Sequence, residues 1–163
     1  RLISAFDLFF KLFNFFRRLL GFARNLRHLR EKIIAAASDR MVVIADPTKV
    51  VEQLGAFHLP VEVLGFGVEA TRIHIQRLLD AMDLSQRPML VRQRDGAAFR
   101  TDEGNLILDL SLECIPDPAA LARGLNAVPG VVEHGLFLNM CQLALIGSPD
   151  GSVIELTRTE DLT

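Results

Sequence analysis

Glu31 and Lys49 are the residues of this 163-residue sequence whose types and positions suit chemistry. Glu31 lies in "LREKIIAAAS" (residues 29–38), at the start of a predicted helix, and Lys49 follows a predicted strand. A carboxylate can transfer a proton as a general acid or base, and an ammonium group can bind phosphate or sugar oxygens. From the residues alone, plainer interpretations stay open: a solvated carboxylate favoured by the helix dipole, and a surface lysine after a turn.

The other polar residues predict less chemistry. Asp46 ends the predicted strand before Lys49, where it either caps the following turn or orients that lysine, and the cap is favoured. "TDEGN" (101–105) and "SPDG" (148–151) are typical of turns. The four histidines have no ligand spacing, so no metal site is predicted, and no cofactor is expected. They are His28, His58, His74 and His134.

Two short elements must position Lys49. "MVVIAD" (residues 41–46) is a continuous apolar run that ends in Asp, the pattern of a buried parallel strand whose carboxyl end faces a site. "DPTKVVEQLG" (46–55) predicts a turn at Pro47 and a short helix that Gly55 closes. Lys49 is therefore expected just beyond the carboxyl end of a buried strand.

Residues 58–137 predict a second unit. Its strands are "LPVEVLGF", "PMLVRQ", "NLILDLSLE" and "GVVEHGLF". Its first helix is "VEATRIHIQRLLDAM", with a buried side expected to hold Ala70, Ile73, Ile75, Leu78, Leu79 and Met82. Its second helix is "DPAALARGLNAV", with Asp117 as N-cap and Pro118 at the first helical position. The order β-α-β-β-α-β is typical of a ferredoxin-like fold. "CQLALIGSPDGSVIELT" (141–157) then predicts a strand, a turn and a return strand.

The first 28 residues predict a basic, Phe-rich amphipathic helix. Seven of the eleven phenylalanines lie before residue 23, and residues 1–30 contain seven Arg or Lys and a single Asp. The apolar stripe is formed by Leu2, Phe6, Phe9, Phe13, Phe16 and Leu20. Such a helix can pack on its own protein, dock on a partner, or lie on an anionic membrane surface through residues 1–20. A translation artefact over residues 1–28 is a further interpretation.

Composition bounds the class of protein. Half of the residues are hydrophobic, 23% are charged and the net charge is −2, so a globular protein is expected and nucleic acid is not an expected partner. No run reaches the roughly 20 apolar residues that span a bilayer, and no signal peptide is recognised. Cys114 and Cys141 lie in apolar surroundings without metal spacing, which favours buried thiols in a reducing compartment and a cytoplasmic location.

Seven segments, in order, resemble the C-terminal part of the ribose-5-phosphate isomerase A family. They are "LREKIIAAAS", "VVIADPTK", "LPVEVLGFG", "TDEGNLILDL", "IPDPAAL", "LNAVPGVVEHGLF" and "IGSPDG". The resemblance runs from about Leu29 to about Glu155. It implies interconversion of ribose 5-phosphate and ribulose 5-phosphate through an enediolate, in the pentose phosphate pathway. It also implies that Glu31 is the catalytic base and that Lys49 binds the substrate.

Other family segments are absent from this sequence. The family has a "GTGST" phosphate loop, a "DGADE" segment at the sugar site and "KGGGG" directly before "LREK". Here residues 22–27 read "FARNLR", and bulky side chains do not allow the close backbone approach to a ligand that glycine allows. The sequence is therefore interpreted as a truncated relative without the N-terminal substrate-binding half. Whether such a chain isomerises its substrate alone stays open.

The resemblance and the patterns together predict an α/β protein with three parts. Residues 1–28 form the amphipathic helix, residues 29–57 and 138–163 form the remnant of a Rossmann-like parallel sheet, and residues 58–137 form the ferredoxin-like domain. A sheet that lacks its usual neighbours has an apolar edge, so a homo-oligomer or a partner subunit is expected. The alternative function is a non-catalytic subunit that docks a partner or membrane through the N-terminal helix.

Overall fold

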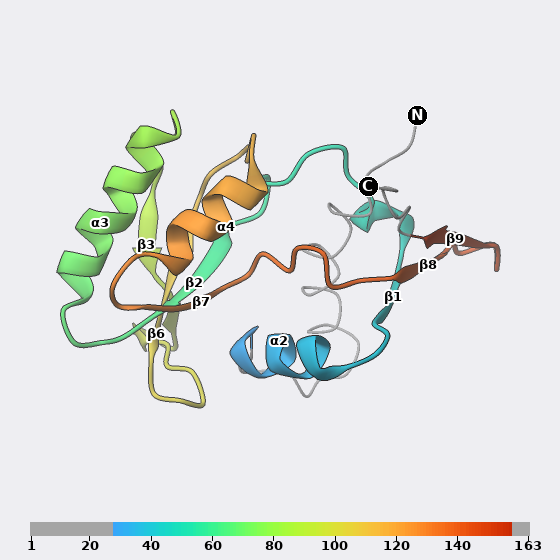
Figure 1. Ribbon diagram of the computed structural model, residues 1–163, viewed down its shortest axis with the longest axis horizontal. Helices are drawn as coiled ribbons and strands as arrows, with labels where there is room; N and C mark the ends of the chain where they lie inside the picture. Colours follow the sequence, from blue (N-terminus) through green and yellow to red (C-terminus); the bar gives the residue numbers. More distant parts are fainter. Residues whose placement is uncertain (1–27, 158–163) are drawn as a thin grey trace. The chain divides into compact units, whose positions relative to one another are not determined.

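The computed structural model describes residues 28–157 as a mixed α/β protein (Figure 1). The broad α/β prediction is confirmed, and the elements follow one another in the predicted order. The predicted Phe-rich helix lies outside the described residues except for His28. None of the helices in residues 28–157 is long and apolar enough to cross a membrane.

The chain divides into two compact units. Among the described residues, unit 1 contains 31–52 and 137–157, and unit 2 contains 28–30 and 53–136. Both candidate site residues, Glu31 and Lys49, belong to unit 1.

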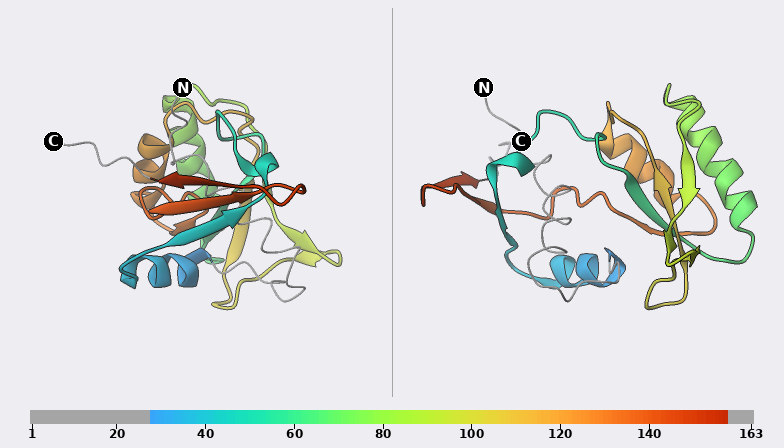
Figure 2. Two further views of the ribbon diagram at one scale, coloured as in Figure 1. Left: turned by 90° about the vertical axis from the view of Figure 1, so that its right-hand side faces the viewer. Right: turned by 180° about the vertical axis from the view of Figure 1, so that it is seen from behind.

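Unit 1 is built on a three-stranded sheet. The strands β1 (Val42–Ala45), β8 (Leu143–Gly147) and β9 (Val153–Thr157) lie in the order β1-β8-β9 (Figure 2, left). Strand β1 is parallel to β8, as its apolar run predicted, and β9 is antiparallel to β8. Helix α2 (His28–Ala37) leads into β1, and the 3-10 helix η1 (Pro47–Lys49) follows it. The buried core of this unit consists of Val43, Ala45, Phe137, Ala144 and Ile146.

Two predictions for this part of the chain are wrong in detail. Strand β1 is buried on one face only, because Val42 and Ile44 are 46% and 61% exposed while Val43 and Ala45 are 4% exposed. The helix expected up to Gly55 is limited to η1, since the β-branched Val50 is already extended. Gly55 is not a helix cap; its φ of +121° lets the backbone pass close to Cys114.

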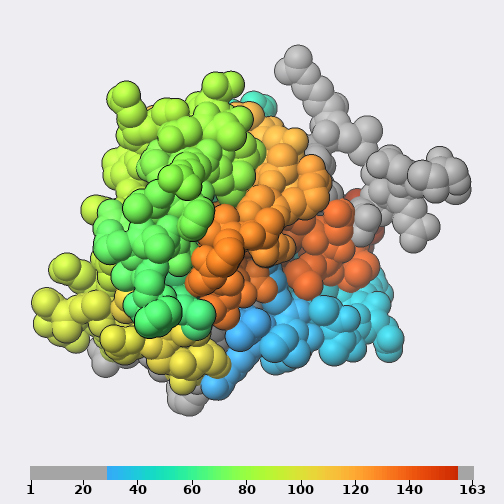
Figure 3. All heavy atoms as spheres, turned by 60° about the vertical axis from the view of Figure 1, so that its left-hand side comes forward, coloured from blue at the N-terminus to red at the C-terminus, as the bar shows by residue number. Residues whose placement is uncertain are grey.

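Unit 2 contains an antiparallel four-stranded sheet in the order β3-β6-β2-β7. Its long strands are β2 (Leu59–Val63) and β6 (Leu106–Leu110), flanked by β3 (Met89–Val91) and β7 (Val131–His134). Helices α3 (Val68–Ala81) and α4 (Pro118–Asn126) cover one face of this sheet (Figures 1 and 2) and lie side by side (Figure 3). A small hairpin, β4 (Gln93–Arg94) with β5 (Ala97–Ala98), was not predicted.

The start of helix α4 agrees with its sequence signal, whereas the buried face of helix α3 differs in part from the prediction. The Asp117 side chain accepts a hydrogen bond of 2.8 Å from the Ala120 N–H, so the predicted cap of α4 is confirmed. On α3, Ile75 and Leu79 are buried as predicted, together with Thr71, which was not predicted. Leu78 and Met82 are partly buried. Ala70 and Ile73 point to solvent, contrary to the prediction.

The two cysteines are half-buried thiols rather than fully buried ones. Cys141 packs against the core of unit 1, and burial raises the pKa of its thiol.

Candidate functional site

Glu31 lies in the first turn of α2. Its side chain is half-buried, and its Oε2 atom has no contact with solvent. The positive end of the helix dipole stabilises a negative charge at this position. A carboxylate shielded from water and held on a helix is a better-defined acceptor for a substrate proton than one on a mobile loop.

A cation-π contact fixes the residue next to Glu31. The Lys32 Nζ atom lies 5.3 Å from the centre of the Phe137 ring. Phe137 is 3% exposed and belongs to the core that β1 and β8 form. Lys32 is thereby held against the core of unit 1, with a contact worth about 0.5–2 kcal/mol.

Arg30, on the other side of Glu31, has its own partners. Its Nε donates to the Glu103 Oε1 at 2.7 Å, and its Nη1 lies 3.4 Å from the Asp102 Oδ2. Both acids belong to the "TDEGN" segment, which forms a turn closed by the hydrogen bond from the Gly104 N–H to the Thr101 carbonyl. The residue before the candidate base is therefore held by two carboxylates.

A buried carboxylate in β2 anchors that same turn. Glu62 is 1% exposed, and its Oε1 accepts hydrogen bonds from the Thr101 hydroxyl at 2.8 Å and the Asn105 amide at 2.9 Å. Two neutral donors on one oxygen compensate part of the cost of burying this group. The turn that carries the partners of Arg30 is therefore tied to the interior of unit 2.

Lys49 is the last residue of η1, directly after β1, and its side chain is half-buried. Asp46 caps this turn: its Oδ1 accepts a 2.9 Å hydrogen bond from the Thr48 N–H and a very short one from the Thr48 hydroxyl. The hydrogen bond from the Thr48 hydroxyl, with a smaller contribution from the Lys49 charge, holds the pKa of Asp46 below its usual value. The favoured interpretation of Asp46 as a cap is confirmed.

The sequence predicted the Asp46 cap in the turn of Lys49, but it did not predict the contact of Lys32 beside Glu31. Helix α2 precedes β1 and η1 follows it, so Glu31 and Lys49 flank one strand in the chain (Figure 1). Lys32 was missed because a helix lysine is usually solvated, and nothing local identifies Phe137 as its partner. Asp-Pro-Thr, by contrast, is a recognisable turn signal, and it identifies Thr48 as the partner of Asp46.

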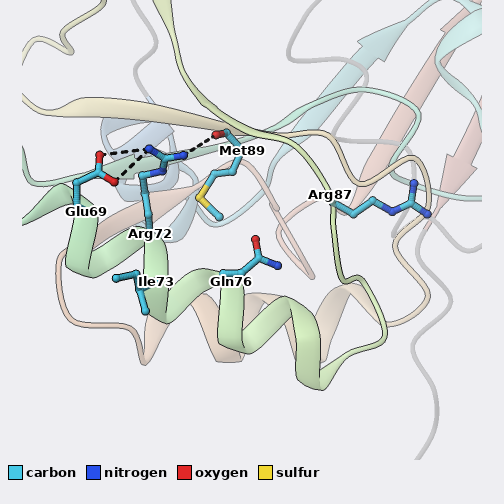
Figure 4. Close-up of a pocket in the computed structure, with 6 residues that line it drawn as sticks. All are labelled: Glu69, Arg72, Ile73, Gln76, Arg87 and Met89. Atoms are coloured by element: carbon cyan, nitrogen blue, oxygen red, sulfur yellow. Dashed lines mark hydrogen bonds and ion pairs between the residues drawn. The ribbon is translucent and has the colours of Figure 1, made fainter.

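Unit 2 has a shallow pocket of about 330 Å³ between α3 and the segment that leads into β3. Its lining groups satisfy one another, because Arg72 binds the Glu69 carboxylate and donates to the Met89 carbonyl (Figure 4). Arg87 extends away from them and pairs with Glu113. Neither Glu31 nor Lys49 lines this pocket. Across residues 28–157, no cluster of three His, Cys, Asp or Glu could hold a metal ion.

These features define an α/β protein in which a carboxylate on helix α2 precedes strand β1 and a lysine follows that strand. The sequence profile of ribose 5-phosphate isomerase A (phosphoriboisomerase A) matches residues 23–151. The chain belongs to this family.

Individual relatives agree with the profile. The ribose-5-phosphate isomerase A of Agrobacterium fabrum is 58% identical over 124 residues, which are 76% of this chain and 53% of that protein. The structure is similar to the ribose 5-phosphate isomerase of Plasmodium falciparum, with a TM-score of 0.73, 34% identity, and coverage of 82% of this chain and 57% of that one. It is also similar to a D-ribose-5-phosphate isomerase in complex with phospho-erythronic acid, with a TM-score of 0.67, 27% identity and coverage of 80% and 55%.

The chain spans about half the length of the curated relatives it matches. The part that is present includes both sequence-predicted site residues, Glu31 and Lys49. The comparisons do not favour the alternative of a non-catalytic docking subunit.

Proposed function

We propose that this chain supplies the catalytic base of a ribose-5-phosphate isomerase, which interconverts ribose 5-phosphate and ribulose 5-phosphate. The observation that carries the proposal is the match to the isomerase family over residues 23–151, which includes the segment of Glu31. The position of Glu31 in the first turn of α2, half-buried and beside two anchored neighbours, supports it.

In the proposed mechanism Glu31 acts on the open-chain form of the sugar. The carboxylate removes the proton from C2 of the aldose, and the electron pair of that C–H bond forms the C1–C2 double bond of an enediolate. The carbonyl oxygen at C1 gains the negative charge and then a proton. The proton of the C2 hydroxyl is the one that the C1 oxygen gains, and Glu31 returns its own proton to C1 as the C2 oxygen becomes the ketone. Both transferred protons therefore stay on the sugar and the carboxylate is regenerated.

Lys49 is proposed to bind the phosphate or a sugar oxygen of the substrate. Lys49 follows the carboxyl end of a parallel strand, the end at which ligands of α/β sheets bind. The bound phospho-erythronic acid of one solved relative, a four-carbon acid with a phosphate group, supports a sugar phosphate as the ligand class. Asp46 keeps the turn of Lys49 in place through Thr48 rather than contacting substrate.

The finer description of the fold is likewise a proposal. We assign residues 58–137 to a ferredoxin-like domain, because β2 and β3 flank β6 in an antiparallel sheet while α3 and α4 cover one face. Residues 29–57 and 138–163 are assigned to the remnant of a Rossmann-like sheet, which the parallel pair β1 and β8 supports. A cytoplasmic location is proposed from the two thiols Cys114 and Cys141.

The function is tested on the assembled protein, meaning residues 1–163 co-expressed with the portion of the Agrobacterium fabrum isomerase that this chain does not match. We expect conversion of ribose 5-phosphate to ribulose 5-phosphate by the assembled protein and no conversion of unphosphorylated ribose. Each chain alone serves as the control. A folded, stable complex that does not turn over ribose 5-phosphate would show the proposed function to be wrong.

A further inference from the structure

Arg30, in the first turn of α2, is held by two carboxylates from a distant part of the sequence. Its Nε donates to the Glu103 Oε1 at 2.7 Å, and its Nη1 lies 3.4 Å from the Asp102 Oδ2. The Asp102 and Glu103 side chains are 16% and 27% exposed, so solvent screens them less than it screens fully exposed charges. A guanidinium that binds two carboxylates through different nitrogens is fixed in orientation as well as in position.

The helix dipole does not favour a cation at this position. The N-terminal end of a helix carries a partial positive charge, which repels a guanidinium in the first turn. Two carboxylates outweigh the single charge of Arg30, so the cluster as a whole is negative beside the positive helix end. Arg30 is therefore explained by its contacts with Asp102 and Glu103 rather than by the electrostatics of the helix.

The turn at residues 101–105, which supplies these carboxylates, is itself fixed within the same unit as Arg30. The Thr101 N–H donates to the Asn105 carbonyl at 3.0 Å, and the Gly104 N–H donates to the Thr101 carbonyl at 3.0 Å. The buried Glu62 carboxylate accepts from the Thr101 hydroxyl and the Asn105 amide. Carboxylates on an ordered turn lose less conformational entropy on pairing than two flexible surface side chains do, which strengthens the contact with Arg30.

Glu31 follows Arg30 directly in the same helix. Side chains at neighbouring helix positions point about 100° apart, so Arg30 and Glu31 do not face each other. Arg30 therefore acts on Glu31 through the backbone of the first turn, which it keeps from fraying or rotating. A base displaced by about 1 Å can slow a reaction as much as about 100-fold, so such an anchor matters for proton transfer.

We infer that Arg30 is a positioning residue for the candidate base. The turn at residues 101–105 holds Arg30, and Arg30 holds the first turn of α2 in the orientation that Glu31 needs. The inference rests on the proposed function, because it requires Glu31 to transfer the proton. Binding of the substrate phosphate by Arg30 is the alternative role, and the two carboxylates that already pair with its guanidinium disfavour it.

The kinetic test uses Arg30→Ala and Arg30→Lys in the assembled protein. Arg30→Ala is expected to lower kcat about tenfold or more and to leave the KM for ribose 5-phosphate within about twofold, because the base is misplaced while the groups that bind substrate remain. Arg30→Lys should recover part of the lost kcat, since an ammonium group still pairs with the carboxylates but lacks the guanidinium fork. Arg72→Ala is the matched control: Arg72 also pairs with a glutamate, Glu69, and its loss should not change kcat.

Hydrogen exchange of purified residues 1–163, followed by mass spectrometry, tests the anchor independently of activity. In an α-helix the N–H groups of residues 32–34 donate to the carbonyls of residues 28–30, so loosening of the first turn exposes them to exchange. Arg30→Ala is expected to speed deuterium uptake at residues 32–34 about tenfold, and Arg72→Ala should leave it unchanged. The Arg30 variants are expected to fold, because this side chain is half-exposed, and circular dichroism checks this.

The two measurements separate this inference from the proposed function. Faster exchange together with a lower kcat would support the inference. Unchanged exchange in Arg30→Ala, or an unchanged kcat in an active assembled protein, would overturn it and leave the proposed function intact. A raised KM at an unchanged kcat would overturn it in favour of phosphate binding. Absence of turnover by the wild-type assembled protein would count against the proposed function, while faster exchange in Arg30→Ala would still support the anchor.

Discussion

Lys49 has the most direct test at the scale of single residues. In the assembled protein Lys49→Ala is expected to raise the KM for ribose 5-phosphate about tenfold or more, because a hydrogen bond to a charged group contributes about 1.5–3 kcal/mol. The kcat should change less, since Lys49 is proposed to bind and not to transfer the proton. Steady-state kinetics measure both constants, and Arg123→Ala, at an exposed position on α4, is the control. An unchanged KM would show that Lys49 does not contact substrate.

Asp46 gives the local fold a predictable pH dependence. The Thr48 hydroxyl lowers the pKa of Asp46 in the folded protein, so the folded state binds its proton less readily than the unfolded chain does. The stabilisation is present above the ordinary value of 3.8 and is lost as the pH falls through the lower folded pKa.

The measurement is the free energy of unfolding between pH 6 and pH 2 for the wild type and Asp46→Asn. Asparagine still accepts the hydrogen bonds from Thr48 but does not titrate. The wild type is expected to lose more stability than the variant below about pH 4, where carboxylates titrate. Parallel curves for the two proteins would contradict the assignment.

At the scale of elements, Gly55 determines how the segment before β2 passes Cys114. A Cβ atom at Gly55 would lie 2.5 Å from the Cys114 backbone nitrogen, at a φ of +121°. Gly55→Ala is expected to destabilise unit 2 by about 3 kcal/mol or more, since both clash and backbone strain contribute. Chemical denaturation measures the change.

Gly96→Ala is the matched control for Gly55→Ala. Gly96 also has a positive φ, +80°, but no atom lies within 4 Å of the position of its Cβ. Its substitution should therefore cost only about 1–2 kcal/mol of backbone strain. Equal losses at the two positions would show that the contact with Cys114 is not what requires glycine.

Glu62 tests the anchor of the turn at residues 101–105. Glu62→Leu leaves the Thr101 hydroxyl and the Asn105 amide without their buried acceptor, which is expected to cost about 2–4 kcal/mol of stability. Glu62→Gln keeps one acceptor oxygen and should cost less than half as much. Urea denaturation compares the two variants, and a leucine variant as stable as the glutamine variant would contradict the anchoring role.

The sequence was sufficient for elements whose signals are local. Asp117 with Pro118 identified the start of α4, and the apolar run before Asp46 identified β1. It was insufficient where a partner far along the chain decides the outcome. Glycine at position 55 is explained by Cys114, and the contact of Lys32 by Phe137, 105 positions further on. The exposure of Val42 and Ile44 on one side of β1 depends on what packs against the strand, and a continuous apolar run does not contain that information.

At the scale of the whole molecule, the exposed apolar side chains of Val42, Ile44 and Val153 predict how the isolated chain behaves. Purified residues 1–163 are expected to self-associate, because apolar side chains on an uncovered sheet bury one another when no partner is present. Sedimentation velocity over a hundredfold range of concentration should show a rising average mass, and Ile44→Lys should reduce it. A monodisperse monomer at all concentrations would contradict this expectation.

The central claim is that Glu31 transfers the proton, and its most direct test is Glu31→Gln in the assembled protein. Glutamine matches glutamate in shape but cannot accept the proton. The account predicts a loss of kcat of at least about 100-fold, with the complex intact and the KM for ribose 5-phosphate little changed. Turnover close to that of the wild type would show that another group is the base and would contradict the account.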